Sequence, residues 1–167
     1  MNLYVLRHGI AEPLDGRRFR TDDERPLAPE GVEKMQRIGQ TMRLLKIKPD
    51  LILTSPLLRA RQTAEIVAGP LKARRKVQPS DALAPEGRPA TLIKQLRALK
   101  PAPNEVVLVG HEPYLSHLIS WLCTGGGDLA IKLKKGGLCA LEIDTLKAGR
   151  CATLLWLMAP RQMLRIS

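Results

Sequence analysis

Aromatic residues are scarce in this chain of 167 residues, which has two Trp, two Tyr and one Phe. Because 44% of the residues are nevertheless hydrophobic, the core must be mostly aliphatic. No strand is studded with aromatic residues in the manner of an RNA-recognition module, and neither a zinc-finger spacing nor a long basic helix is present. We therefore expect no nucleic-acid partner.

Cysteine is also rare, with only Cys123, Cys139 and Cys151 and no C-x-x-C spacing. This excludes a disulfide framework and a zinc site, and the apolar surroundings of each cysteine are typical of buried thiols in a reducing compartment. No apolar run approaches the length needed to span a membrane, and the run at 2–6 is too short for a signal peptide. We expect a cytoplasmic protein without a membrane partner.

Acidic residues are the minority charge, with 16 Asp and Glu against 27 Lys and Arg, which gives a net charge of +11. The excess is uneven, because residues 1–100 hold 20 basic and 11 acidic residues, a net charge of +9. Such an excess attracts anionic partners such as phosphorylated substrates or an acidic protein surface. The densest basic run, KARRK at 72–76, is predicted to be a solvated loop.

Predicted strands and helices alternate along the chain. Apolar runs predict strands at 2–7, 51–54, 76–79, 105–110, 138–143 and 151–158, and helical spacing predicts helices at 29–46, 57–68, 90–100 and 113–123. Ser55 is predicted to cap the second helix and Pro56 to occupy its first turn. The fold class is therefore α/β, a three-layer α/β/α sandwich with a mostly parallel central sheet, in a single domain over 1–167.

Basic side chains follow three of the predicted strands. The first strand ends in Arg7 and His8, the second leads into a helix with Arg59 in its first turn, and the strand at 105–110 ends before His111. Ligands gather at the carboxyl edge of such sheets, and helix N-termini favour anions. We expect these four residues, the basic quartet, to surround one phosphate.

Three motifs now carry a family resemblance: RHG at 7–9, SPLLRARQTA at 55–64 and VGHEP at 109–113. Their order and spacing resemble the histidine phosphatase superfamily, whose fold is phosphoglycerate mutase-like, over roughly residues 2–158. The short chain and RPLAPEG at 25–31 resemble, more narrowly, the SixA-type phosphohistidine phosphatases. The resemblance implies a phosphatase that uses no metal and no cofactor.

The resemblance also implies roles for the quartet. His8 is the nucleophile that takes the phosphoryl group, and Arg7, Arg59 and His111 bind its oxygens. A neutral imidazole is a competent nucleophile, and fixed cationic donors stabilise the charge that develops on the equatorial oxygens. Gly9, grouped with the phosphate-binding residues, is expected to turn the chain and accept a hydrogen bond from His8, which leaves the other ring nitrogen free.

The general acid is less clearly marked. Many larger relatives carry a glutamate for this task in an insertion that this chain lacks, and Asp81 and Glu86 are the nearest candidates by order. A phosphohistidine departs as neutral imidazole once its other nitrogen is protonated, so it needs less acid assistance than a serine or sugar phosphate. Arg25, in DDERP at 22–26, is predicted to contact substrate or order its loop, with a salt-bridged surface turn as the alternative.

The predicted function is hydrolysis of protein phosphohistidine, for example on a histidine-containing phosphotransfer domain, through a covalent phosphohistidine at His8. One alternative is a phosphomonoesterase of the same superfamily for a sugar, nucleotide or cofactor phosphate. Another is a non-enzymatic module that binds phosphate or acidic proteins through its basic surface. The expected partner is a phosphorylated protein or a small phosphoester, and a monomer is favoured. A mutase is disfavoured, because it would need a longer insertion to enclose its intermediate.

Overall fold

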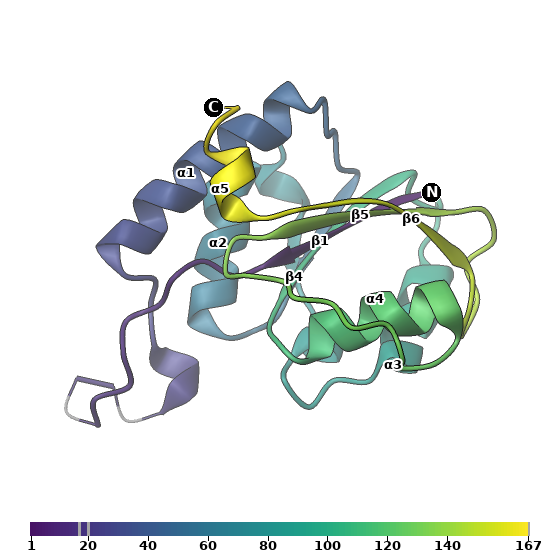
Figure 1. The fold of residues 1–167 in the computed structure, drawn as a ribbon, viewed down its shortest axis with the longest axis horizontal. Helices are drawn as coiled ribbons and strands as arrows, with labels where there is room; N and C mark the ends of the chain where they lie inside the picture. Colours follow the sequence, from purple (N-terminus) through teal and green to yellow (C-terminus); the bar gives the residue numbers. More distant parts are fainter. Residues whose placement is uncertain (17, 20, 167) are drawn as a thin grey trace.

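The computed structural model describes residues 1–16, 18–19 and 21–166 (Figure 1). Six strands form one sheet in the order β3-β2-β4-β1-β5-β6. Their bounds are β1 Asn2–Arg7, β2 Leu51–Thr54, β3 Val77–Pro79, β4 Glu105–Gly110, β5 Leu138–Ile143 and β6 Ala152–Met158. The strands β3, β2, β4 and β1 run parallel to one another, whereas β5 runs antiparallel to both β1 and β6. The prediction of a mostly parallel sheet is confirmed.

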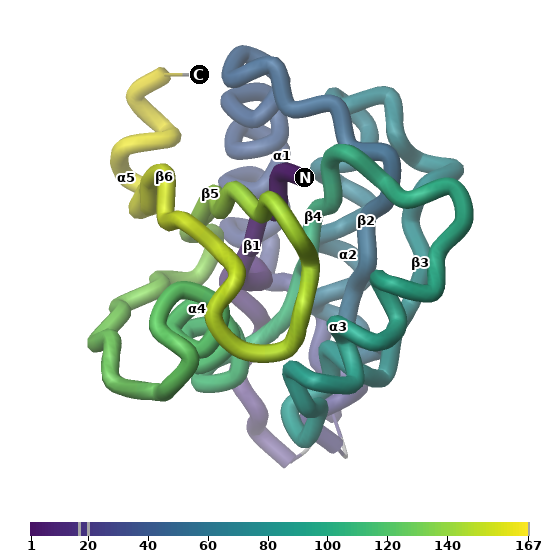
Figure 2. Tube along the Cα trace, turned by 90° about the vertical axis from the view of Figure 1, so that its right-hand side faces the viewer, coloured from purple at the N-terminus to yellow at the C-terminus, as the bar shows by residue number. Residues whose placement is uncertain are grey.

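Helices cover both faces of this sheet (Figures 1 and 2). On one face lie α1 (Pro29–Leu44), α2 (Leu58–Ala68) and the short α5 (Pro160–Met163); on the other lie α3 (Pro89–Ala98) and α4 (Tyr114–Thr124). The predicted three-layer α/β/α sandwich is therefore confirmed. None of the helices in the described ranges is long and apolar enough to cross a membrane.

The central strand β4 shows why its sequence is continuously apolar. Val106 and Leu108 pack in the cluster that includes α3 and α4, while Val107 and Val109 pack in the cluster that includes α1 and α2. Successive side chains of a strand point to opposite faces, so a strand covered on both sides needs apolar residues at every position. All four of these side chains are fully buried.

Several predicted boundaries shift by one or two residues. The first helix ends at Leu44 rather than 46, because Lys46 has a φ of 61°, outside the helical region. The second helix begins at Leu58 with Leu57 as its N-cap, so the predictions that Ser55 caps it and that Pro56 lies in its first turn are wrong. The basic run at 72–76 is exposed as predicted, apart from the buried Ala73, but it contains a 3-10 helix, η2 (Arg74–Lys76). The other 3-10 helices, η1 (Asp22–Glu24) and η3 (Asp81–Leu83), and α5 are too short to produce a sequence period.

The three cysteines are free thiols, but they are not equally buried. Cys139 is fully buried in β5, and this burial raises the pKa of its thiol to about 12. Cys123 and Cys151 are only half-buried, so the prediction of three buried thiols is wrong for these two.

The carboxyl ends of β1, β2 and β4 lie side by side at one edge of the sheet, because these strands are parallel neighbours in the order β2-β4-β1. The segment between β1 and α1 leaves from this edge, at the left of Figure 1, and carries η1. This edge is where the predicted site residues meet.

Candidate active site

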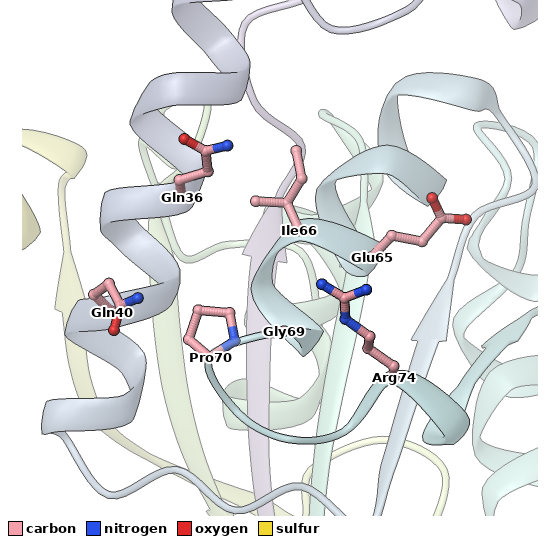
Figure 3. A pocket seen from close by; sticks show the side chains of 7 residues that line it. All are labelled: Gln36, Gln40, Glu65, Ile66, Gly69, Pro70 and Arg74. Atoms are coloured by element: carbon pink, nitrogen blue, oxygen red, sulfur yellow. The ribbon is translucent and has the colours of Figure 1, made fainter.

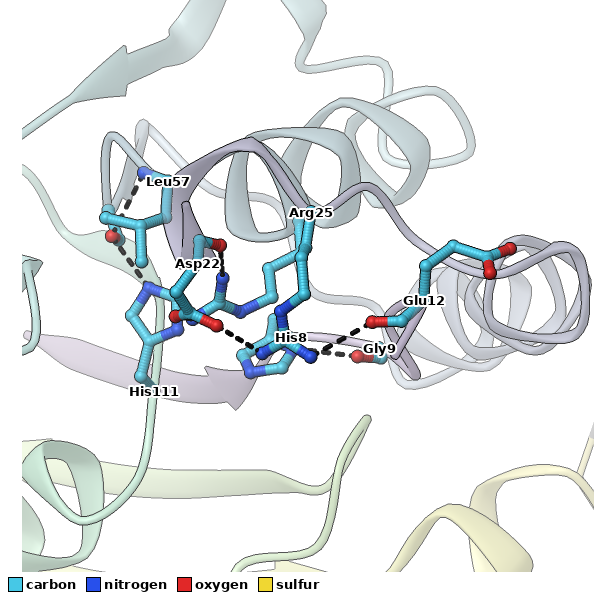
Figure 4. Close-up of polar contacts among 9 residues, drawn as sticks. His8, Gly9, Glu12, Asp22, Arg25, Leu57 and His111 are labelled. Carbon is cyan, nitrogen blue, oxygen red and sulfur yellow. Dashed lines mark hydrogen bonds and ion pairs between the residues drawn. The ribbon is translucent and has the colours of Figure 1, made fainter. Parts of the chain in front are cut away.

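His8 lies immediately after β1 and is almost fully buried, with 6% of its surface exposed. Its backbone N–H donates to the carbonyl of Gly110 at 3.0 Å, which continues the pairing of β1 with β4. The imidazole Nδ1 lies 2.7 Å from the carbonyl oxygen of Gly9 (Figure 4). Because a carbonyl oxygen only accepts, Nδ1 carries the ring proton and Nε2 keeps its lone pair. The hydrogen bond expected between His8 and Gly9 is present.

His111 follows β4 and faces His8, with the two ring centroids 5.0 Å apart. Its Nε2 lies 2.8 Å from the hydroxyl oxygen of Ser55, which also accepts the N–H of Leu57 at 3.3 Å (Figure 4). Because the Ser55 oxygen already accepts the N–H of Leu57, its hydroxyl proton can be donated to Nε2 of His111. Nε2 is then the acceptor, and Nδ1 carries the ring proton of His111. Nδ1 is buried and has no hydrogen-bond partner among the described residues.

The two arginines of the quartet are held from different directions. Arg59, the second residue of α2, is 4% exposed and donates from Nη1 and Nη2 to Asp22. Arg7, the last residue of β1, donates from Nη1 to the carbonyl of Leu133 at 2.9 Å. Both arginines keep a buried Nε–H with no hydrogen-bond partner among the described residues. Such donors are costly to bury without an acceptor, so the site is suited to an anion.

Asp22 joins Arg59 to the loop that carries Arg25. Its Oδ1 lies 2.5 Å from Nη2 of Arg25, and Nη1 of Arg25 donates to the carbonyl of Glu12 at 3.0 Å (Figure 4). Arg25 also has a buried Nε without a partner. Burial opposes ionisation of Asp22, but the hydrogen bonds and charges of Arg59 and Arg25 outweigh it, so the pKa of this carboxyl is lowered. Arg25 is thus ion-paired within the loop that Asp22 joins to Arg59, and its contact with substrate stays a prediction.

The electrostatics keep both histidines neutral. Burial above all lowers the pKa of His8 to about 3; the Gly9 hydrogen bond opposes this shift, and the charges of His111 and Arg59 add to it. The pKa of His111 falls to about 4, again mainly through burial and then through Arg59, while Asp22 acts in the opposite direction. At neutral pH the lone pair of His8 is therefore available for attack.

Two close approaches fix α1 and α2 against the site. Thr63 of α2 accepts the N–H of Gly9 at 3.1 Å and donates to the carbonyl of Arg59 at 2.7 Å. Both backbone polar groups of Gly9 are therefore engaged within the protein, which favours a role in orienting His8. At Gly31, in the first turn of α1, a Cβ would overlap the carbonyl oxygen of Ile10. This explains the glycine that ends the RPLAPEG motif.

The two predicted acids lie outside this cluster. Asp81 is exposed at the start of η3 and lines a separate cavity of about 570 Å³ with Pro56. Glu86 is exposed in the segment before α3. Within the described ranges, neither forms a hydrogen bond or ion pair with the quartet. The carboxylate that does is Asp22, which a sequence pattern marks only as one of three consecutive acidic residues.

In the described part of the chain, neither a metal site nor the cavity between α1 and α2 involves the quartet. No group of three or more His, Cys, Asp or Glu side chains that could hold a metal ion occurs in the described part of the chain. A cavity of about 650 Å³ lies between α1 and α2, lined by polar side chains such as Gln36 and Gln40 and by Arg74 (Figure 3). It shares no lining residue with the quartet.

Comparison with known proteins gives the class first. A solved structure of the protein histidine phosphatase SixA complexed with tungstate matches with a TM-score of 0.83 and 26% identity, covering 98% of this chain and 99% of that one. The fold is that of this phosphatase. The family follows directly: residues 3–86 match the histidine phosphatase superfamily (branch 1), and the chain belongs to this superfamily. It is a hydrolase of the metal-independent, histidine phosphatase type.

Two curated relatives place the chain further within this superfamily. An uncharacterized protein of Picosynechococcus is 37% identical over 147 residues, 85% of this chain and 85% of that protein. The phosphohistidine phosphatase SixA of Escherichia coli is 29% identical over 126 residues, 75% of this chain and 76% of that protein.

Proposed function

We propose that this chain hydrolyses phosphohistidine on a protein, and that the phosphoryl group passes through Nε2 of His8 to water. The observation that carries this proposal is the buried, neutral imidazole of His8, whose Nδ1 proton is held by the carbonyl of Gly9 at 2.7 Å. This arrangement selects Nε2 as the nucleophile without a separate base.

In the first step, the lone pair of Nε2 forms a bond to phosphorus while the bond from phosphorus to the substrate nitrogen breaks. The leaving imidazole takes the bonding pair, and it is neutral if its other nitrogen is already protonated. His8 then carries the phosphoryl group on Nε2 and a proton on Nδ1, so its ring is positively charged. The hydrogen bond to Gly9 stabilises this charged form.

Four donors are suited to the phosphoryl oxygens. These are the unpartnered Nε–H groups of Arg7, Arg25 and Arg59 and the unpartnered Nδ1 of His111. Donors already fixed by Asp22, Leu133 and Ser55 need little reorganisation when charge spreads over the equatorial oxygens. The solved SixA structure contains tungstate, a tetrahedral oxyanion like phosphate, which supports an oxyanion at this edge.

In the second step, a water oxygen forms a bond to phosphorus and the bond to Nε2 breaks. The bonding pair returns to Nε2, which restores the neutral imidazole with its proton on Nδ1. The proton lost by water passes to the phosphate product or to solvent. The site thus completes a full turnover without any change in the protein's own protonation.

The state of Asp22 supports a nitrogen-linked substrate. Both of its carboxylate oxygens are paired, one with Arg59 and one with Arg25, and its pKa is lowered. An ionised carboxylate cannot protonate an alcohol leaving group. Imidazole departs without such help, so the site is matched to phosphohistidine better than to phosphoserine or a sugar phosphate.

The test measures phosphate release by the whole protein from three substrates under identical conditions. These are a phosphotransfer domain phosphorylated on histidine, a phosphoserine peptide and a small aryl phosphate. His8→Ala serves as the blank, and His117→Ala is the matched control because His117 is exposed on α4 and forms no hydrogen bond or ion pair with the quartet among the described residues. We expect rapid release from the phosphohistidine domain, lost in His8→Ala and kept in His117→Ala. Equal turnover of phosphohistidine and phosphoserine, or turnover of the aryl phosphate alone, would overturn the proposed substrate.

A further inference from the structure

A second cationic feature lies directly beside the site. A cavity of about 640 Å³ is lined by five basic side chains, Arg7, Lys34, Lys134, Lys135 and Arg161. Arg7 belongs both to this cavity and to the quartet, so the two share a wall. The other four cations have no part in the proposed hydrolysis.

The fold builds this cavity from segments far apart in the sequence. Lys34 lies on α1 and Arg161 on α5, which packs against α1 (Figure 1). The segment with Lys134 and Lys135 is tied to the end of β1, because the N–H of Gly136 lies 3.0 Å from the carbonyl of Arg7. The guanidinium of Arg7 also donates a hydrogen bond to the carbonyl of Leu133, the residue before Lys134. These two attachments hold the lysine pair next to His8.

Most cations of this cavity have no ion-pair partner among the described residues. No carboxylate is among its lining residues. Lys34 pairs with Glu30, whereas Lys134, Lys135 and Arg161 form no ion pair in the parts of the chain that the structure describes. Like charges around one cavity repel each other, and the fold gains nothing from gathering them. The arrangement is therefore suited to an anionic partner.

The rest of the lining narrows the chemistry of that partner. Ile10, Pro160 and Leu164 are half-buried and supply an apolar wall. Among the described residues no aromatic side chain lines the cavity, so it lacks the aromatic platform typical of a nucleobase site. A free phosphate has no apolar surface that could pack against this wall. A protein segment with carboxylates and an aliphatic side chain satisfies both parts of the surface.

We propose that this cavity docks an acidic segment of the phosphoprotein substrate and so places its phosphohistidine at His8. The inference rests on the proposed function and names how its protein substrate is recognised. The cations that would bind the substrate are also not those that dominate the net charge of the sequence. Residues 1–100 carry +9 of the net charge, yet three of the five cations come from residues 134–161. Only the folded chain brings those three beside Arg7.

The experiment compares two triple variants that remove the same charge. The test variant is Lys134→Ala with Lys135→Ala and Arg161→Ala. The control variant is Arg75→Ala with Lys94→Ala and Arg97→Ala, three exposed residues away from the cavity. Each is assayed on a phosphotransfer domain phosphorylated on histidine and on a small aryl phosphate. We expect the test variant to raise KM for the phosphoprotein at least tenfold with kcat within twofold, and to leave aryl phosphate turnover unchanged. The control variant should match the wild type.

Two outcomes would overturn the docking surface. One is a KM for the phosphoprotein that is the same in the test and control variants. The other is an equal loss on the aryl phosphate, which would make the cavity part of the phosphate site itself. Matching thermal unfolding curves for both variants show that neither change acts through the fold. The single charge-reversal variant Lys135→Glu should also raise KM for the phosphoprotein.

A binding measurement separates this inference from the proposed function. A fluorescein-labelled peptide of alternating Glu and Leu residues is titrated with the wild type and both triple variants, and anisotropy is recorded at rising salt. We expect the test variant alone to lose binding, and salt to weaken binding to the wild type. If phosphohistidine is not hydrolysed but this pattern holds, the proposed function fails and the docking surface stands. No binding to the wild type at low salt would overturn the docking surface.

Discussion

Arg59 donates two hydrogen bonds to Asp22, one to its backbone carbonyl and one to Oδ2, each 2.7 Å long. The two residues lie 37 positions apart, on α2 and on the loop that follows β1. Both Nη groups of the arginine are thereby fixed, while its buried Nε–H has no partner among the described residues and can bind a ligand. The loop thus sets the position of a guanidinium in the quartet.

Asp22→Asn is expected to lower kcat/KM for an aryl phosphate about tenfold, as is usual when a residue that orients a site is changed. The amide keeps the shape of the carboxylate but loses the charge that holds Arg59 and Arg25. Steady-state kinetics check this, with Asp23→Asn as the control because Asp23 is exposed and adjacent. Wild-type kinetics in Asp22→Asn would show that Arg59 needs no ionised partner.

Ser55→Ala should affect both stability and catalysis. It removes the partner of Nε2 of His111 at 2.8 Å in a fully buried position, which costs about 1–3 kcal/mol in the free energy of unfolding. The tautomer of His111 is then no longer fixed, so kcat should fall while KM changes less. Urea unfolding and kinetics check the two effects. Ser116→Ala, whose hydroxyl bonds a surface carbonyl, should change neither.

The lowered pKa values predict acid sensitivity. Native His8 takes a proton only near pH 3 and native His111 near pH 4, whereas the unfolded chain takes both near 6.5. Between these limits the unfolded state binds more protons, so the free energy of unfolding falls as pH is lowered below 6.5. The slope is at most about 1.4 kcal/mol per pH unit for each histidine. Urea unfolding between pH 7 and 5 measures it.

The variant that tests this titration is His8→Asn. His8→Asn should flatten the pH dependence by one histidine. A slope unchanged by His8→Asn would contradict a neutral, buried His8.

Two glycines should differ in their tolerance of alanine. At Gly31 the added Cβ would overlap the backbone carbonyl of Ile10, which cannot move without shifting the loop after His8. At Gly9 it would meet Cγ of Met35 at 2.7 Å, the middle of a flexible side chain. We expect Gly31→Ala to destabilise by about 3 kcal/mol or more and Gly9→Ala by about 1–2 kcal/mol. Thermal unfolding ranks them, and in a Met35→Ala background the added cost of Gly9→Ala should fall while that of Gly31→Ala should not.

The positions of the main elements follow from the sequence because their signals are local. The alternating burial of β4 requires a continuously apolar run, and the helical spacing of Ile38 and Met42 marks the buried face of α1. The 3-10 helices and α5 escaped prediction because three or four residues cannot establish a period. The roles of Asp81 and Glu86 as acids stay predictions, although their placement gives them no contact with the quartet.

By itself the sequence determined the quartet, since strand ends in a parallel sheet must converge and each residue stands in a recognisable motif. Only the tertiary structure decided what holds the quartet. The pairing of Asp22 with Arg59, of Ser55 with His111 and of Arg7 with Leu133 joins positions 37, 56 and 126 residues apart. The same holds for the cationic cavity beside Arg7. Such contacts depend on how helices and loops pack around the sheet, and no local pattern of residues encodes that packing.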